Sequence, residues 1–135
     1  MIDAVNVPVQ SVAPNGSVLF ASTRICTGCS VRHEEGSSRF VALKPGVYQV
    51  AFNANVTTPT GDVATPLQFE ITQDGEVVAG SKMVVTPAAV GTLVNISTTV
   101  LIRVFCDCCV SIGVRNTGTS TANVQDANFV ITREC

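Results

Sequence analysis

The feature that most constrains this chain is a strict alternation of side chains that follows a turn. Lys44-Pro45-Gly46 predicts the turn, because proline fixes φ and glycine tolerates a positive φ. Directly after it, Tyr48, Val50 and Phe52 fall on one face of a predicted strand. Three large apolar side chains on one face of a strand indicate that this face is packed in a hydrophobic core.

The opposite face of the same strand carries small or polar side chains and no charge: Val47, Gln49, Ala51, Asn53 and Asn55. A strand face that meets water usually carries some charged residues, so this composition suggests a surface for a partner. An uncharged face in contact with solvent is the other interpretation, and the sequence leaves both open.

Shorter alternating segments separated by turn signals occupy the rest of the chain. Asp74-Gly75 is a strong signal for a hairpin. No segment shows a pattern that clearly predicts a helix. The pattern predicts an all-β fold, an antiparallel jelly-roll sandwich of eight to ten strands. The other expected strands are residues 17–23, a strand that ends with Phe40 to Leu43, and residues 67–72, 77–86, 93–105, 110–115 and 127–132.

The N-terminal segment, residues 1–16, is open to two interpretations. Val5, Val7 and Val9 alternate with polar residues and proline, as in a strand. Pro8 removes a backbone donor, which confines the segment to a sheet edge or an extended arm. We therefore divide the chain into residues 1–16, an arm or first strand, and residues 17–135, the jelly-roll domain. The 135 residues are 46% hydrophobic and 13% charged, which suits one packed domain.

Several of these segments resemble a known fold family. The motif Gly46-x-Tyr48-x-Val50-x-Phe52-x-Ala54-x-Val56 is similar to the central strand of tumour necrosis factor-like and complement-head-like jelly rolls. The segments 69–71 and 74–81 resemble the next hairpin, and 108–116 and 127–133 the last two strands. This resemblance, over about residues 40–133, implies a homotrimer. It makes Gln49, Ala51 and Asn53 the candidates for the trimer interface.

A narrower resemblance is to small jelly-roll proteins encoded in the structural modules of Firmicutes phages and prophages, on segments 31–37, 54–61, 83–90 and 123–128. It implies a non-enzymatic virion structural protein, a trimeric capsid decoration or head-fibre protein. Its partners would be the major capsid protein or another virion protein, and loops 57–62 and 116–121 would meet a host surface or glycan. The alternative function is a receptor-binding or cell-surface adhesion head.

The cysteines allow three interpretations. Cys26 and Cys29 form one pair, and Cys106 and Cys108 form a second, so four thiolates could hold zinc. The second pair has a spacing that suits zinc less well. Disulfides are a rival, because a virion leaves the reducing cytoplasm. Unbonded thiols are the third interpretation. No other cofactor is expected.

Other chemistry has little support in the sequence. His33 is the only histidine and sits in a charged segment, which predicts a solvated hairpin tip rather than a catalytic base. The net charge of −2 gives no footprint for nucleic acid, and no apolar stretch is long enough to span a membrane. The start Met1-Ile-Asp-Ala lacks a secretory signal, which predicts synthesis in the bacterial host cytoplasm and, with the phage resemblance, a place on the capsid surface of the virion. We expect no enzymatic activity.

Overall fold

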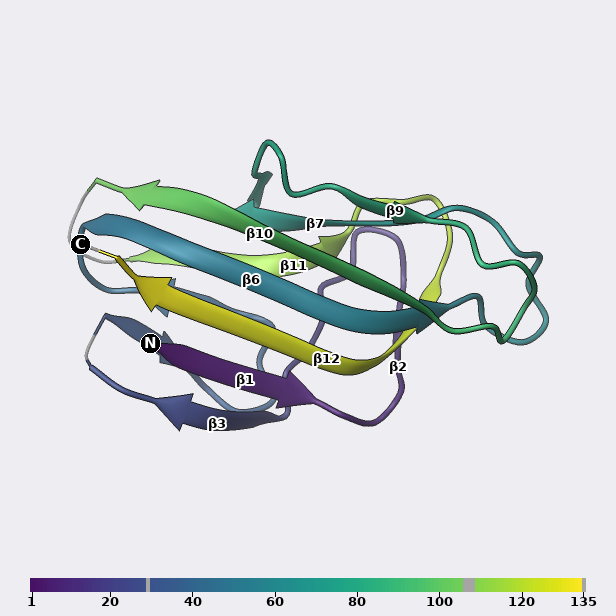
Figure 1. The fold of residues 1–135 in the computed structure, drawn as a ribbon, viewed down its shortest axis with the longest axis horizontal. Helices are drawn as coiled ribbons and strands as arrows, with labels where there is room; N and C mark the ends of the chain where they lie inside the picture. The colour runs from purple at the N-terminus through teal and green to yellow at the C-terminus, as the bar shows by residue number, and fades with distance from the viewer. Residues whose placement is uncertain (29, 106–108, 135) are drawn as a thin grey trace.

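The alternating segment forms β6 (Gly46–Thr57), which lies between two other long strands of the fold. A computed structural model describes residues 1–28, 30–105 and 109–134. In it, β6 pairs along its length with β10 (Val94–Val104) on one side and with β12 (Ala122–Arg133) on the other. Both pairings are antiparallel, and Phe52 lies opposite Thr98 and Phe129. Figure 1 shows these three long strands side by side.

Two antiparallel sheets pack face to face. Sheet A has the order β10-β6-β12-β1-β3, with β2 on β12, and sheet B has the order β4-β5-β11-β7-β8, with β9 on β7. The described ranges contain no helix, and therefore none long and apolar enough to cross a membrane. The predicted all-β antiparallel sandwich is confirmed. The remaining strands are β1 (Ile2–Asn6), β2 (Gln10–Val12), β3 (Ser22–Cys26), β4 (Val31–His33), β5 (Phe40–Ala42), β7 (Leu67–Gln73), β8 (Glu76–Val77), β9 (Met83–Val85) and β11 (Val110–Asn116).

An aromatic cluster fills the space between the sheets. Phe20 is fully buried, and its ring centroid lies 5.4 Å from those of Phe40 and Phe129 and 6.2 Å from that of Phe52. Phe40 comes from sheet B, whereas Phe52 and Phe129 come from sheet A. These separations suit the edge-to-face and offset contacts that aromatic rings prefer. The cluster therefore joins the two sheets at their centre.

The core residues expected from strand alternation are buried. Tyr48, Val50, Phe52, Phe69 and Phe129 each expose 1% of their surface or less. The inner face of β6, which carries Tyr48, Val50 and Phe52, was therefore assigned correctly from the sequence.

The expected strand over residues 17–23 is wrong. Strand β3 begins only at Ser22. Before it, the Val18 N–H donates to the Val114 carbonyl of β11, and the Phe20 N–H donates to the Ser37 carbonyl of the loop between β4 and β5. Both acceptors belong to sheet B or to a loop between two of its strands, so this segment lies along sheet B before β3 joins sheet A. Phe20 is fully buried from this segment.

The expected single strand over residues 77–86 is interrupted. Strands β8 and β9 are separated by a turn in which Gly80 has φ of 87°. Buried Ser81 holds this turn, because its Oγ accepts the Ile71 N–H at 3.1 Å and donates to the Val78 carbonyl at 2.6 Å. The hydroxyl thus replaces ladder hydrogen bonds that a continuous strand would have made.

Residues 1–16 contribute two strands to sheet A. Strand β1 lies between β12 and β3, with Ile2 and Ala4 buried, and β2 pairs with β12. Between the two partners, β12 has a bulge at Asp126, where φ is 52°. The Asp126 N–H donates to the Val7 carbonyl at 3.2 Å, so the bulge also holds the turn from β1 to β2.

We expect Phe52→Ala to lower the free energy of unfolding by about 3–5 kcal/mol, because the change leaves a cavity in the aromatic cluster. Urea denaturation followed by circular dichroism measures the difference. Val63→Ala is the control, since Val63 is 79% exposed in the loop between β6 and β7 and its truncation should cost less than about 0.5 kcal/mol. Equal losses at the two positions would contradict this account of the core.

Deletion of residues 1–12 should prevent folding. It removes β1 from the interior of sheet A and leaves β12 and β3 with unpaired backbone groups beside an emptied part of the core. Circular dichroism and amide hydrogen exchange of the truncated protein provide the measurement. A truncated protein that keeps its cooperative unfolding transition would show that this segment is dispensable to the fold.

Candidate interaction surface

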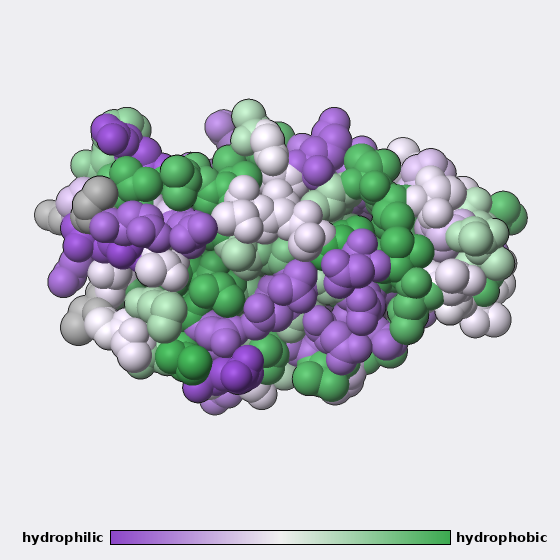
Figure 2. All heavy atoms as spheres, in the orientation of Figure 1, coloured by the Kyte–Doolittle hydropathy of each residue, from purple (hydrophilic) through white to green (hydrophobic). Residues whose placement is uncertain are grey.

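The outer face of sheet A carries a continuous set of uncharged side chains. On β6 these are Gln49, Ala51 and Asn53, the candidates from the sequence, and the structure places all three on the outer side. Their cross-strand neighbours continue the surface on both sides. We call this set the uncharged face; it consists of Gln49, Ala51 and Asn53 on β6, Ser97, Thr99 and Leu101 on β10, and Asn128, Val130 and Thr132 on β12. In Figure 2, which views this side, hydrophilic and hydrophobic side chains are interspersed over the three strands.

The charges nearest to this face are at its margins and are already engaged. Asp3 of β1 lies opposite Val130 and forms an ion pair of 3.2 Å with Arg24 of β3. It also accepts a hydrogen bond from the Asn128 amide. Arg103, near the end of β10, lies with its guanidinium carbon 5.8 Å from the centre of the Phe105 ring. The centre of the face therefore presents no charge to a partner.

The outer face of sheet B differs in this respect. Arg32 lies on β4, Glu70 on β7 and Arg115 on β11, and the last two are directly opposite each other in the register. Such a mixture of charges is common on a surface that meets water. The two outer faces of the sandwich therefore differ in charge: the face of sheet A lacks charged side chains at its centre, whereas the face of sheet B carries them.

One edge of the uncharged face is apolar. Leu101 is 65% exposed and Phe105 is 81% exposed. Phe105 also lines an apolar hollow of about 340 Å³, together with Val47, Arg103 and Val104. Strand β10 stands at the end of sheet A, and along residues 94–104 its outer edge pairs with no strand of the described chain. A long unprotected edge with exposed apolar side chains is a surface that proteins usually cover.

The structure describes only some of the cysteines on which the sequence predictions depend. Cys26, at the end of β3, is exposed and has a free thiol, whereas Cys109 is disulfide-bonded. Cys29, Cys106 and Cys108 lie outside the described residues. Among the residues that are described, no group of three or more histidine, cysteine or acidic side chains is arranged to hold a metal ion. The four-cysteine zinc site stays a prediction.

His33 is not the solvated hairpin tip that the sequence predicts. Its ring is half-buried and stacks on Phe40 at 4.1 Å with an interplanar angle of 9°. Nε2 lies 2.9 Å from the Ser37 carbonyl, which can only accept, so Nε2 carries a hydrogen. Nδ1 lies 3.0 Å from Thr23 Oγ1. Because both ring nitrogens are engaged, His33 holds the loop that follows β4 instead of serving as an exposed base.

Strand alternation revealed part of this surface and missed the rest. It identified Gln49, Ala51 and Asn53, but their neighbours on β10 and β12 depend on which strands pair and in which register. Leu101 could have been found from the sequence, because it alternates with the apolar positions of its strand and therefore falls on the outward, otherwise polar face.

Comparisons with known proteins bear on the fold. No protein-family model and no curated protein sequence matches the chain. Solved structures do match: the globular domain of the zebrafish complement 1qA protein has a TM-score of 0.73 at 9% identity, covering 99% of this chain and 96% of that one. The Eiger TNF of S. frugiperda has a TM-score of 0.72 at 8% identity, covering 99% and 92%. Murine APRIL has a TM-score of 0.62 at 10% identity, covering 95% and 97%. The chain therefore has the jelly-roll fold that these domains share.

Because Cys109 is disulfide-bonded, we expect reductant to lower the melting temperature of the protein. A metal chelator should leave the melting temperature unchanged. Differential scanning calorimetry with each additive compares the two, and mass spectrometry before and after reduction checks the oxidation state. Destabilisation by chelator, with release of about one zinc per chain, would instead support the four-cysteine site.

Proposed function

We propose that the chain forms a homotrimer through the uncharged face of sheet A and serves as a non-enzymatic structural protein on the surface of a phage capsid, as a decoration or head-fibre protein. The fold is that of complement-head and TNF domains, and the resemblance of the chain to these jelly rolls implies a trimer. The observation that carries the proposal is the lack of charge over the nine side chains of the uncharged face.

The composition of this face suits permanent burial. Charged side chains are expensive to bury without a partner, whereas the methyl groups of Ala51, Val130 and Thr99 gain from leaving water. The amides of Gln49 and Asn53 can donate hydrogen bonds to, and accept them from, polar groups of a neighbouring copy. The centre of a stable interface between subunits is similarly poor in charge.

The edge strand β10 supports the same interface. Its unpaired backbone groups and exposed Leu101 adjoin the uncharged face, so a second copy that covers the face also shields the edge. Each protomer then presents a face and an edge, and the edge of one copy against the face of the next is a contact that three copies can close into a ring.

We expect light scattering at micromolar concentration to give three times the 14.1 kDa mass of the chain. Ala51→Arg should convert the trimer to a monomer, because it places an unpaired charge at the centre of the buried face. Ala79→Arg is the matched control, since Ala79 is exposed in the turn between β8 and β9 and should leave the trimer intact. A wild-type monomer, or a trimer that persists in Ala51→Arg with native circular dichroism, would contradict the interface.

The virion assignment has its own test. An antibody raised against the chain should label the capsids of particles purified from a bacterial host that carries the gene, in immuno-electron microscopy. The support for this assignment is the similarity of segments 31–37 and 123–128 to jelly-roll proteins of phage structural modules. Labelling of the cell surface, with unlabelled capsids, would favour an adhesion head instead.

A further inference from the structure

A small polar pocket lies on the outer side of sheet B, away from the uncharged face. It has a volume of about 220 Å³. Its wall includes Arg32 of β4, Glu34 and Ser37 of the following loop, and Arg39 just before β5, while Val41 of β5 and Cys109 complete the lining. Pockets for drug-sized ligands are larger, about 300–1,000 Å³, so this one suits a single small ring.

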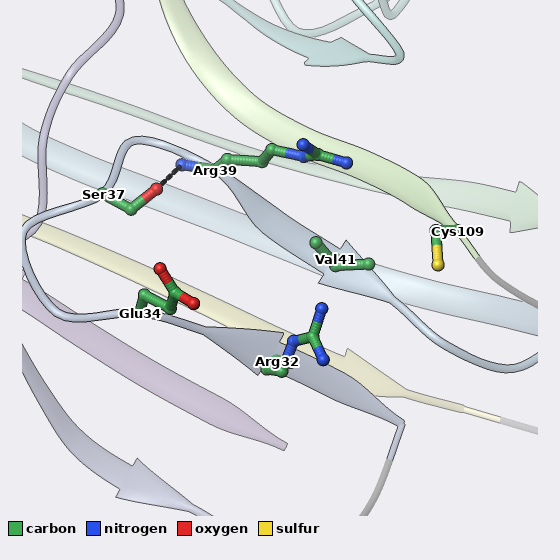
Figure 3. Close-up of a pocket in the computed structure, with 6 residues that line it drawn as sticks. All are labelled: Arg32, Glu34, Ser37, Arg39, Val41 and Cys109. Atoms are coloured by element: carbon green, nitrogen blue, oxygen red, sulfur yellow. Dashed lines mark hydrogen bonds between the residues drawn. The ribbon is translucent and has the colours of Figure 1, made fainter.

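Within the described part of the chain, no ion pair engages the charged side chains of the pocket. Among the residues that the structure describes, the one ion pair joins Arg24 to Asp3. The side chains of Arg32, Arg39 and Glu34 therefore line one cavity without pairing with each other. In Figure 3, the two guanidinium groups lie on opposite sides of Val41, and the Glu34 carboxylate lies toward Ser37. The pocket thus offers two unpaired cationic donors and one anionic acceptor to a ligand.

The loop that carries these groups is held rigidly. His33 Nε2 donates to the Ser37 carbonyl at 2.9 Å, and the Phe20 N–H donates to the same oxygen at 3.3 Å. The Ser37 N–H donates to the Glu34 carbonyl at 3.0 Å, which closes the turn. The aromatic stack of His33 on Phe40 ties the loop to the core. A ligand therefore meets a site whose backbone needs little ordering on binding.

The hydroxyl of Ser37 is also available. Its Oγ accepts the Arg39 N–H at 3.0 Å, which leaves the hydroxyl hydrogen free to donate. An arginine guanidinium recognises a carboxylate through two parallel hydrogen bonds. The Glu34 carboxylate is a hydrogen-bond acceptor, so it needs a ligand with donors such as sugar hydroxyls. Its negative charge repels an anion that offers no hydroxyl group.

From this set of groups we infer that the pocket binds an acidic monosaccharide, a sugar ring that carries one carboxylate. The carboxylate lies between Arg32 and Arg39, and ring hydroxyls donate to Glu34 and accept from Ser37. The aliphatic side chain of Val41 lines the pocket beside the ring. The site is on sheet B, so it stands whether or not the proposed trimer forms.

Three probe ligands separate the contributions. Glucuronate carries the carboxylate and the hydroxyls, glucose carries only the hydroxyls, and acetate carries only the carboxylate. Titration followed by protein NMR at low ionic strength should give a saturable shift with glucuronate and affinities about tenfold weaker with glucose and with acetate. Added salt should weaken glucuronate binding, because the contact is between charges.

Variants of exposed residues test the assignment without disturbing the core. Arg32→Gln and Arg39→Gln should each weaken glucuronate binding about tenfold. Lys82→Gln makes the same change in net charge at an exposed position outside the pocket, and its affinity should match the wild type. Glu34→Ala should raise the affinity for acetate and abolish the preference for glucuronate over acetate.

Several outcomes would overturn the inference. Sulfate that binds as tightly as glucuronate would reveal a simple anion site. The absence of saturable glucuronate binding, or equal weakening in Lys82→Gln and Arg32→Gln, would show that the pocket does not recognise a carboxylate. The oligomeric state of the same samples, from light scattering, is read independently, so failure of the trimer and failure of the pocket are distinguishable.

Discussion

The contact between Phe20 and the rings of both sheets is the interaction on which the rest of this structure depends. A two-sheet sandwich is stable only if the inner faces fill the space between them, and this chain has six phenylalanines, one tyrosine and no tryptophan with which to do so. Four of the phenylalanines meet in one cluster. Because Phe20 comes from the segment that connects β2 to β3 and not from a strand, the cluster also holds this connecting segment in place.

Because the core is filled by the inner faces of the two sheets, the side chains on the two outer faces can differ in polarity and charge. On sheet A, residues 49–53 and their neighbours on β10 and β12 present methyl groups, hydroxyls and amides without charge. On sheet B, Arg32, Glu34 and Arg39 surround a polar pocket. One face is thus suited to permanent burial against further copies of the chain, while the other is suited to a soluble ligand. The proposed trimer contact and the proposed ligand site therefore lie on opposite sides of one core.

His33 connects the core to the pocket. Its ring stacks on Phe40 inside the sandwich, and its Nε2 donates to Ser37 in the loop that carries Glu34 and leads to Arg39. The burial of the ring therefore contributes to the position of the charged groups outside. A lone histidine among charged residues gives no sign of this arrangement, since the stack requires Phe40 to lie directly opposite it on the neighbouring strand.

The sequence by itself determined the all-β class, the buried face of β6 and the uncharged face opposite, because a period of two is a local property of a strand. It could not determine that β3 begins only at Ser22, that Ser81 interrupts a strand, or that His33 is packed, because each depends on which neighbouring strand or loop supplies the hydrogen-bond partner in the folded chain. The pocket is of the same kind: Arg32 and Val41 become neighbours only through the pairing of β4 with β5. Strand register, which tertiary packing decides, is what turned scattered surface residues into a face and a site.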